Sequence, residues 1–264
     1  MRRYFQIKPV SRGMTLVELM VAITIGMFLL LALFSVFISF KKSSQSQTGI
    51  AQMQDDQRMV MTILSQVIQS AGYFPNPTSS TVSTALVSDS TSISGISFSA
   101  GQLIFGQDSG VASSPDTLYI RYQSGQNDGV VNCQGGTNAS STTATYINQL
   151  SVASSTLQFT CALYGATGVS TTPVALVGGI NTSGSAATTC TSVGYLGISN
   201  IKFLYGTDAS GSLSVTRYAS AGAVTNWANV YSVQPTVTQL YCLQQGALPQ
   251  AVNFSRIIYL PNQA

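Results

Sequence analysis

The chain has 264 residues, a formal net charge of +3 and a sequence pI near 8.7. This length fits one or at most two domains. Four of the 11 basic residues lie in the first 12 positions, so 11 less 4 leaves 7 basic against 8 acidic residues in the remainder. That remainder has no basic surface for nucleic-acid phosphates, so we expect no nucleic-acid partner.

The chain begins with a short basic leader, residues 1–13, which ends at Gly13. One carboxylate, Glu18, follows, and Leu19–Phe40 then runs for 22 residues without a formal charge. At 1.5 Å per residue this run is about 33 Å long, close to the roughly 30 Å hydrocarbon thickness of a bilayer. We predict that residues 14–40 span a membrane, with the basic leader on the cytoplasmic side.

A secretory signal peptide does not fit this segment, because its apolar core would be only about 7 to 15 residues long. An ordinary membrane anchor remains an alternative, but an anchor has no use for Glu18. A carboxylate inside a membrane is energetically costly and marks a functional site. We therefore expect a cationic partner for Glu18.

The order of residues around Gly13 resembles the class III leader of type IV pilins and type II secretion pseudopilins. Gly13 is followed by Met14-Thr15-Leu16-Val17-Glu18 and then by the apolar run; the family most often has Phe where this chain has Met14. The resemblance implies that a prepilin peptidase cuts between Gly13 and Met14 and that the new amino terminus is N-methylated. It also implies that Glu18 pairs with the terminal amine of a neighbouring subunit.

Residues 41–73 are polar but keep a helical period. Apolar residues recur every three or four positions, interrupted only at Gln57: Ile50, Met53, Val60, Leu64, Val67 and Ala71. No proline interrupts residues 14–73, so we predict one helix of about 60 residues whose outer half packs on the rest of the chain. Gly72 can adopt a left-handed capping conformation, and Pro75 prevents the helix from continuing.

Residues 74–264 are rich in Ser, Thr, Gly and Asn and contain several runs with the alternation of β-strands. The candidate strands are residues 116–122, 156–164, 201–205, 215–218, 230–243 and 252–259. Pro235 marks an edge or a break. The predicted fold class is α+β, with one long N-terminal helix packed on an antiparallel β-sheet domain that has long loops.

Four cysteines lie in this last domain: Cys133, Cys161, Cys190 and Cys242. None is in a Cys-x-x-Cys pair and the chain has no histidine, so we expect no metal site and no cofactor. An even number in an exported domain predicts two disulfides. Of three connectivities, Cys133–Cys161 with Cys190–Cys242 closes the smaller loops and is favoured; Cys161–Cys190 with Cys133–Cys242 is the alternative.

The sequence gives no support for an enzyme. Without histidine there is no Ser-His-Asp or Cys-His nucleophile system. No serine lies in a Gly-x-Ser-x-Gly motif, and no glycine-rich loop ends in Gly-Lys-Ser/Thr. We expect no catalytic residues.

Within the pilin class, the chain resembles the PilW family of minor pilins. The matching pieces include QMQDDQRMVMTILSQVIQSAGYF (52–74), DTLYIRY (116–122), LQFTC (157–161) and ISNIKFLYGTD (198–208). The resemblance implies a role in the priming or tip complex of a type IV pilus, a fibre that serves cell adhesion and twitching motility.

The same resemblance implies the partners and the location. The partners would be other minor and major pilins and the prepilin peptidase. The protein would cross the bacterial inner membrane once, with its amino terminus cytoplasmic, before reaching the pilus, periplasm or cell surface. Two alternatives stay open: a pseudopilin of a type II secretion or competence (DNA-uptake) system, and an adhesin module at a pilus tip.

Overall fold

The structure is a computed structural model that describes residues 13–179, 189–191, 193–208, 211 and 214–263. The leader residues 1–12 lie outside the described residues. The chain divides into two compact units, one running to Gln45 and the other from Ser46 to Ala264. The second unit contains the outer part of the long helix together with all the strands.

The long helix α1 (Leu16–Gln69) is continuous over 54 residues. Its predicted apolar stripe is buried from Val60 to Ala71, whereas Ile50 is 41% exposed, so the stripe packs only in its last part. The helix ends short of the predicted residue 73. Gly72 then adopts the predicted left-handed conformation, with φ 72°, and donates its N–H to the Arg121 carbonyl at 2.9 Å.

A short helix, ten strands and two 3₁₀ turns follow in the described part of the chain. Their bounds are α2 (Val82–Ala85), β1 (Ile104–Gln107), β2 (Thr117–Ser124), β3 (Ala144–Ala153), β4 (Gln158–Tyr164), β5 (Val174–Gly178), β6 (Gly194–Thr207), β7 (Arg217–Ala219), η1 (Ala221–Ala223), η2 (Trp227–Asn229), β8 (Val230–Cys242), β9 (Gln250–Ser255) and β10 (Ile258–Tyr259).

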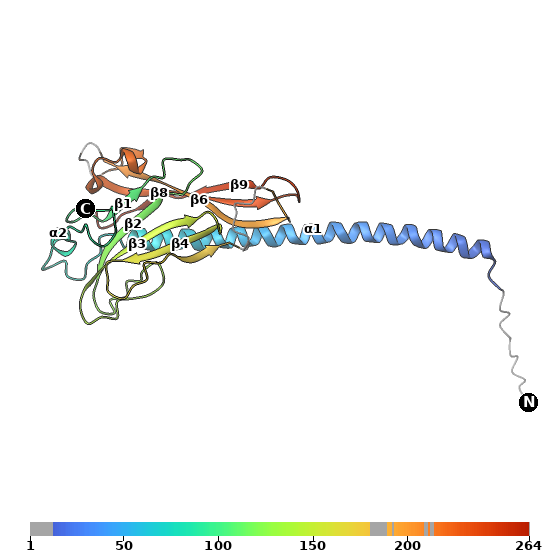
Figure 1. The fold of residues 1–264 in the computed structure, drawn as a ribbon, viewed down its shortest axis with the longest axis horizontal. Helices are drawn as coiled ribbons and strands as arrows, with labels where there is room; N and C mark the ends of the chain where they lie inside the picture. The colour runs from blue at the N-terminus through green and yellow to red at the C-terminus, as the bar shows by residue number, and fades with distance from the viewer. Residues whose placement is uncertain (1–12, 180–188, 192, 209–210, 212–213, 264) are drawn as a thin grey trace, which may run out of the picture. The chain divides into compact units, whose positions relative to one another are not determined.

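The strands form two five-stranded antiparallel sheets where the sequence predicted a single sheet. The first has the order β1-β2-β3-β4-β5, and the second has the order β10-β8-β6-β7 with β9 also paired to β8. Strands of both sheets run alongside the outer part of α1 (Figure 1), and side chains from α1 and from both sheets share one core. Representative members are Leu64 of α1, Ile120 of β2, Phe159 of β4, Phe203 of β6 and Val233 of β8. The helix therefore gives the two sheets a common surface.

Three strands were absent from the prediction: β1, β3 and β5. Strand β3 is covered on both faces, because Leu150 lies in the main core while Ile147 packs with Phe98 and Tyr119 on the other face. On the core face of β3 the buried polar Asn148 takes the place of an apolar residue, which interrupts the apolar alternation in the sequence. Strands β1 and β5 are only 4 and 5 residues long, too short for a clear pattern.

The prediction that Pro235 breaks the strand was wrong, since β8 continues through it and pairs there with β6; on the other side of β8 the pairing does stop opposite Pro235, between β9 and β10. The Pro235 carbonyl accepts a hydrogen bond from the Arg256 N–H at 3.4 Å. A residue in an antiparallel strand directs its N–H and C=O to the same neighbour. The nitrogen of Pro235 therefore faces the gap between β9 and β10. Because no strand pairs with β8 there, the missing N–H of proline removes no hydrogen bond from the sheet.

Polar side chains also join the outer part of α1 to the second sheet. The Gln239 side-chain amide donates to the Met53 carbonyl and to the Tyr195 hydroxyl, both at 3.1 Å. The Tyr195 hydroxyl also lies near the Asp56 carboxylate. Burial raises the pKa of Asp56, and the nearby charge of Asp55 adds to the rise, while the Tyr195 hydroxyl opposes it. The contact thus holds a partly desolvated carboxylate against a sheet.

We expect Asp56→Asn to change how stability depends on pH. The raised pKa means that the native state keeps a proton at a pH where the unfolded chain has lost it, so the free energy of unfolding falls as pH rises above about 4. Asparagine has a similar shape but carries no charge, so the variant lacks this fall. Urea unfolding of both full chains in detergent, across the acid range, measures the difference; parallel pH curves would contradict it.

We expect Gly106→Ala in β1 to destabilise the second unit. A methyl group at residue 106 would overlap the ring of Tyr205, which has no exposed surface. Overpacking of this kind costs about 1–3 kcal/mol. The matched control is Gly222→Ala, where the added carbon meets nothing within 4 Å. Urea unfolding should show a lower midpoint for Gly106→Ala alone, and equal midpoints would refute the packing argument.

Candidate functional site

The junction between the leader and α1 is exposed. Gly13, Met14 and Thr15 precede the helix, and the Met14 side chain is 67% exposed. A Cβ atom at Gly13 would meet nothing within 4 Å. The peptide bond after Gly13, where the resemblance implies cleavage, therefore lies in an open segment next to the helix start.

Glu18 lies in the first turn of α1 and caps the helix. Its Oε2 atom accepts hydrogen bonds from the Thr15 N–H at 2.9 Å and the Thr15 hydroxyl at 3.1 Å. The Glu18 N–H donates back to the Thr15 hydroxyl at 3.3 Å. These reciprocal bonds form a capping box, which satisfies N–H groups that would otherwise lack partners at the amino end of the helix.

The sequence interpretation of Glu18 missed this capping role. The signal was present in Thr15-Leu16-Val17-Glu18, because a threonine followed three residues later by a glutamate is the signature of a capping box. Only Oε2 takes part; within the described residues, Oε1 of Glu18 forms no hydrogen bond. The exposed carboxylate therefore keeps one oxygen for an outside partner while the other caps the helix.

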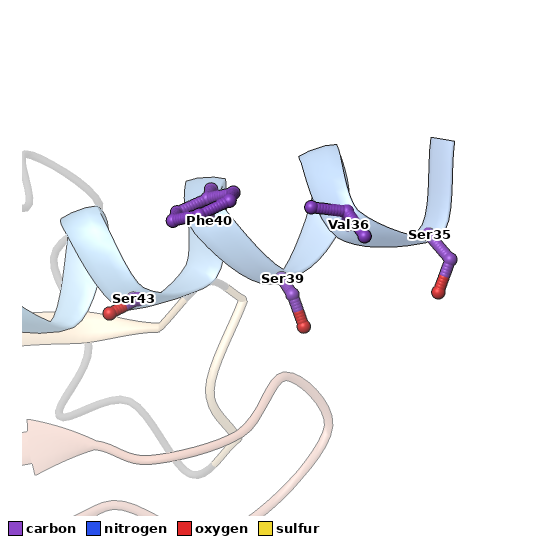
Figure 2. Close-up of a pocket in the computed structure, with 5 residues that line it drawn as sticks. All are labelled: Ser35, Val36, Ser39, Phe40 and Ser43. Atoms are coloured by element: carbon purple, nitrogen blue, oxygen red, sulfur yellow. The ribbon is translucent and has the colours of Figure 1, made fainter. Parts of the chain in front are cut away.

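The inner part of α1 is apolar and uncovered. Among the described residues, α1 is the one helix long and apolar enough to cross a membrane. Figure 2 shows a shallow depression on it, lined by Ser35, Val36, Ser39, Phe40 and Ser43. These residues follow one another at intervals of one and three along one helix, so the depression is part of the helix surface and not an enclosed cavity.

The four cysteines lie in the second unit and form the favoured pairs. Cys133–Cys161 joins the loop before β3 to β4 inside the main core. Cys190–Cys242 joins the segment before β6 to the end of β8, and both of its cysteines are buried in a small cluster with Leu157 and Leu196. The cysteines and Glu18 thus belong to different compact units, and the disulfides stabilise the strands.

Comparison with known families gives a match at the amino terminus. Residues 8–34 match the prokaryotic N-terminal methylation motif. The motif spans the end of the leader, Gly13, Glu18 and the apolar segment as far as residue 34. The chain is therefore pilin-like at its amino terminus, with a prepilin-type leader followed by an apolar helix.

The other comparisons add less. No curated protein matches the chain. Among solved structures, a type IV-like pilin from Thermus thermophilus is similar, with a TM-score of 0.44 and 11% sequence identity, over 81% of this chain and 97% of that chain. The features of the chain that bear on its function are accordingly the amino-terminal motif and the geometry around Glu18.

Proposed function

We propose that the chain is a minor pilin of the PilW type that takes part in type IV pilus assembly, in a priming or tip complex. It inserts into the inner membrane through α1, with its amino terminus cytoplasmic, and loses the leader to a prepilin peptidase. Its partners are other minor and major pilins, and its role is structural. The methylation motif at residues 8–34 supports this assignment.

The observation that carries the proposal is the exposed Glu18 carboxylate beside the leader junction. Its uncommitted Oε1 is available to a neighbour's terminal amine, and the surrounding apolar side chains would exclude water from that pair once helices pack. An unpaired charge in an apolar environment is costly, so Glu18 would favour packing against a neighbour that places a positive charge beside it. Glu18 would thus select neighbours that have already been cleaved.

The processing step predicts the behaviour of Gly13. Replacing Gly13 with leucine should block cleavage, because the peptidase would meet a bulky side chain at the scissile bond. Intact-mass analysis of the membrane-extracted protein should then find residues 1–13 still attached. Met14→Phe, which introduces the residue most common in the family, is the control and should be cleaved. Normal processing of the leucine variant would refute the cleavage site.

Two substitutions at Glu18 separate docking from capping. Glutamine can still complete a capping box with Thr15 but carries no charge, whereas alanine has no charge and cannot complete the capping box. If Glu18 pairs with an amine, both Glu18→Gln and Glu18→Ala should lower the number of pili per cell, by roughly tenfold or more. Electron microscopy of cells provides the count.

Thr15→Ala is the matched control, because it removes the capping hydroxyl and keeps the carboxylate. It should reduce piliation less than either change at Glu18. Immunoblots of membranes must show equal amounts of each variant. Normal piliation with Glu18→Gln together with a defect in Thr15→Ala would assign the carboxylate to helix capping and overturn the docking proposal.

A further inference from the structure

A groove of about 330 Å³ lies between the outer part of α1 and the end of β9, wholly within the second unit. Arg58 of α1 and Arg256, which follows β9, line its two sides. Met61 and Phe254 supply its apolar surface, and Gln57 and Ser255 add polar side chains. Residues distant in the sequence thus bring two guanidinium groups to one groove.

The two arginines have no acidic partner. Neither Arg58 nor Arg256 makes an ion pair or a side-chain hydrogen bond with any residue that the structure describes. Asp55, one helical turn before Arg58, does not approach it within ion-pair distance. Among the other cations in the described part of the second unit, Lys202 is paired with Asp116 and Arg121 is buried. Arg217 is exposed but does not line this groove.

The groove therefore combines unused hydrogen-bond donors with an apolar surface. A guanidinium group binds a carboxylate through two parallel N–H···O bonds, and such charge-assisted bonds are stronger than neutral ones. The buried Met61 and the half-buried Phe254 would contact an apolar group next to that carboxylate. Two cations are too few for a polyanion such as nucleic acid, whose binding depends on many phosphate contacts.

A sheet edge beside the groove favours a protein ligand. Strand β9 pairs with β8 alone among the described strands, so the backbone groups on its other side are free. Its sequence, Gln250 to Ser255, contains no lysine or proline, the residues that commonly block edge pairing. An extended segment can add to such an edge while its side chains enter adjacent pockets.

We propose that this groove binds an acidic side chain, flanked by an apolar residue, on a neighbouring protein. Arg58 and Arg256 hold the carboxylate, and Met61 and Phe254 receive the apolar neighbour. The identity of this neighbour as another pilus subunit rests on the proposed function, whereas the binding chemistry is independent of it. The groove would then be a second contact, separate from Glu18, between this chain and its partner.

The test uses the purified full chain in detergent micelles and two matched peptides, acetyl-Leu-Glu-Leu-amide and acetyl-Leu-Gln-Leu-amide. Ligand-observed NMR titration should show the Glu peptide binding about tenfold more tightly than the Gln peptide. The double variant Arg58→Gln/Arg256→Gln should lose this preference. Arg217→Gln, which removes an exposed arginine elsewhere, should retain it.

Three outcomes would overturn the proposal. Equal binding of the two peptides would exclude a carboxylate site, and loss of the preference in Arg217→Gln would show a general charge effect. Inorganic phosphate binding more tightly than the Glu peptide would assign the groove to a small oxyanion. Because both arginines are exposed, the unfolding midpoint of the double variant should match that of the natural chain. The titration needs no pili, so its result is independent of the piliation counts for Glu18.

Discussion

The burial of one short apolar face of α1, from Val60 to Ile68, is the constraint on which the second unit depends. This face packs against side chains from both sheets, whereas the short α2, η1 and η2 add only partly buried side chains to the same core. The helix has weak amphipathic character over its full length because its inner part is apolar all round. One continuous helix therefore has two parts: an uncovered apolar surface up to Phe40 and a face buried in the protein core from Val60 onward.

The amino-terminal site gives Glu18 a capping role and, under the proposed function, a second role in docking. In the uncleaved chain Glu18 completes a capping box with Thr15, and the start of α1 is thereby fixed close to the leader junction. Cleavage after Gly13 would leave Thr15 and Glu18 in place and create an amine at Met14. The cap and the proposed docking contact use the same group, so under this proposal the charge would already have hydrogen bonds before a partner arrives.

Few residues of the second unit are charged, and their environments differ. Lys202 lies 2.7 Å from Asp116 and donates to the Val111 carbonyl, so it fastens the loop after β1 onto β6. Arg121 is buried, donates to the Val87 carbonyl and lies over the Phe98 ring. Arg58 and Arg256 differ from these residues, because neither guanidinium group has a partner in the described part of the unit.

The sequence by itself determined the features that depend on neighbouring residues: the apolar run, the glycine and prolines that end α1, the strands whose apolar residues alternate and the even cysteine count. The capping box was equally local and was overlooked. Only the tertiary structure decided the rest. The division into two sheets, the doubly covered β3 and the continuity of β8 through Pro235 depend on which surfaces meet. The groove between Arg58 and Arg256 exists only because β9 folds back beside α1, a contact between segments far apart in the chain that no local pattern records.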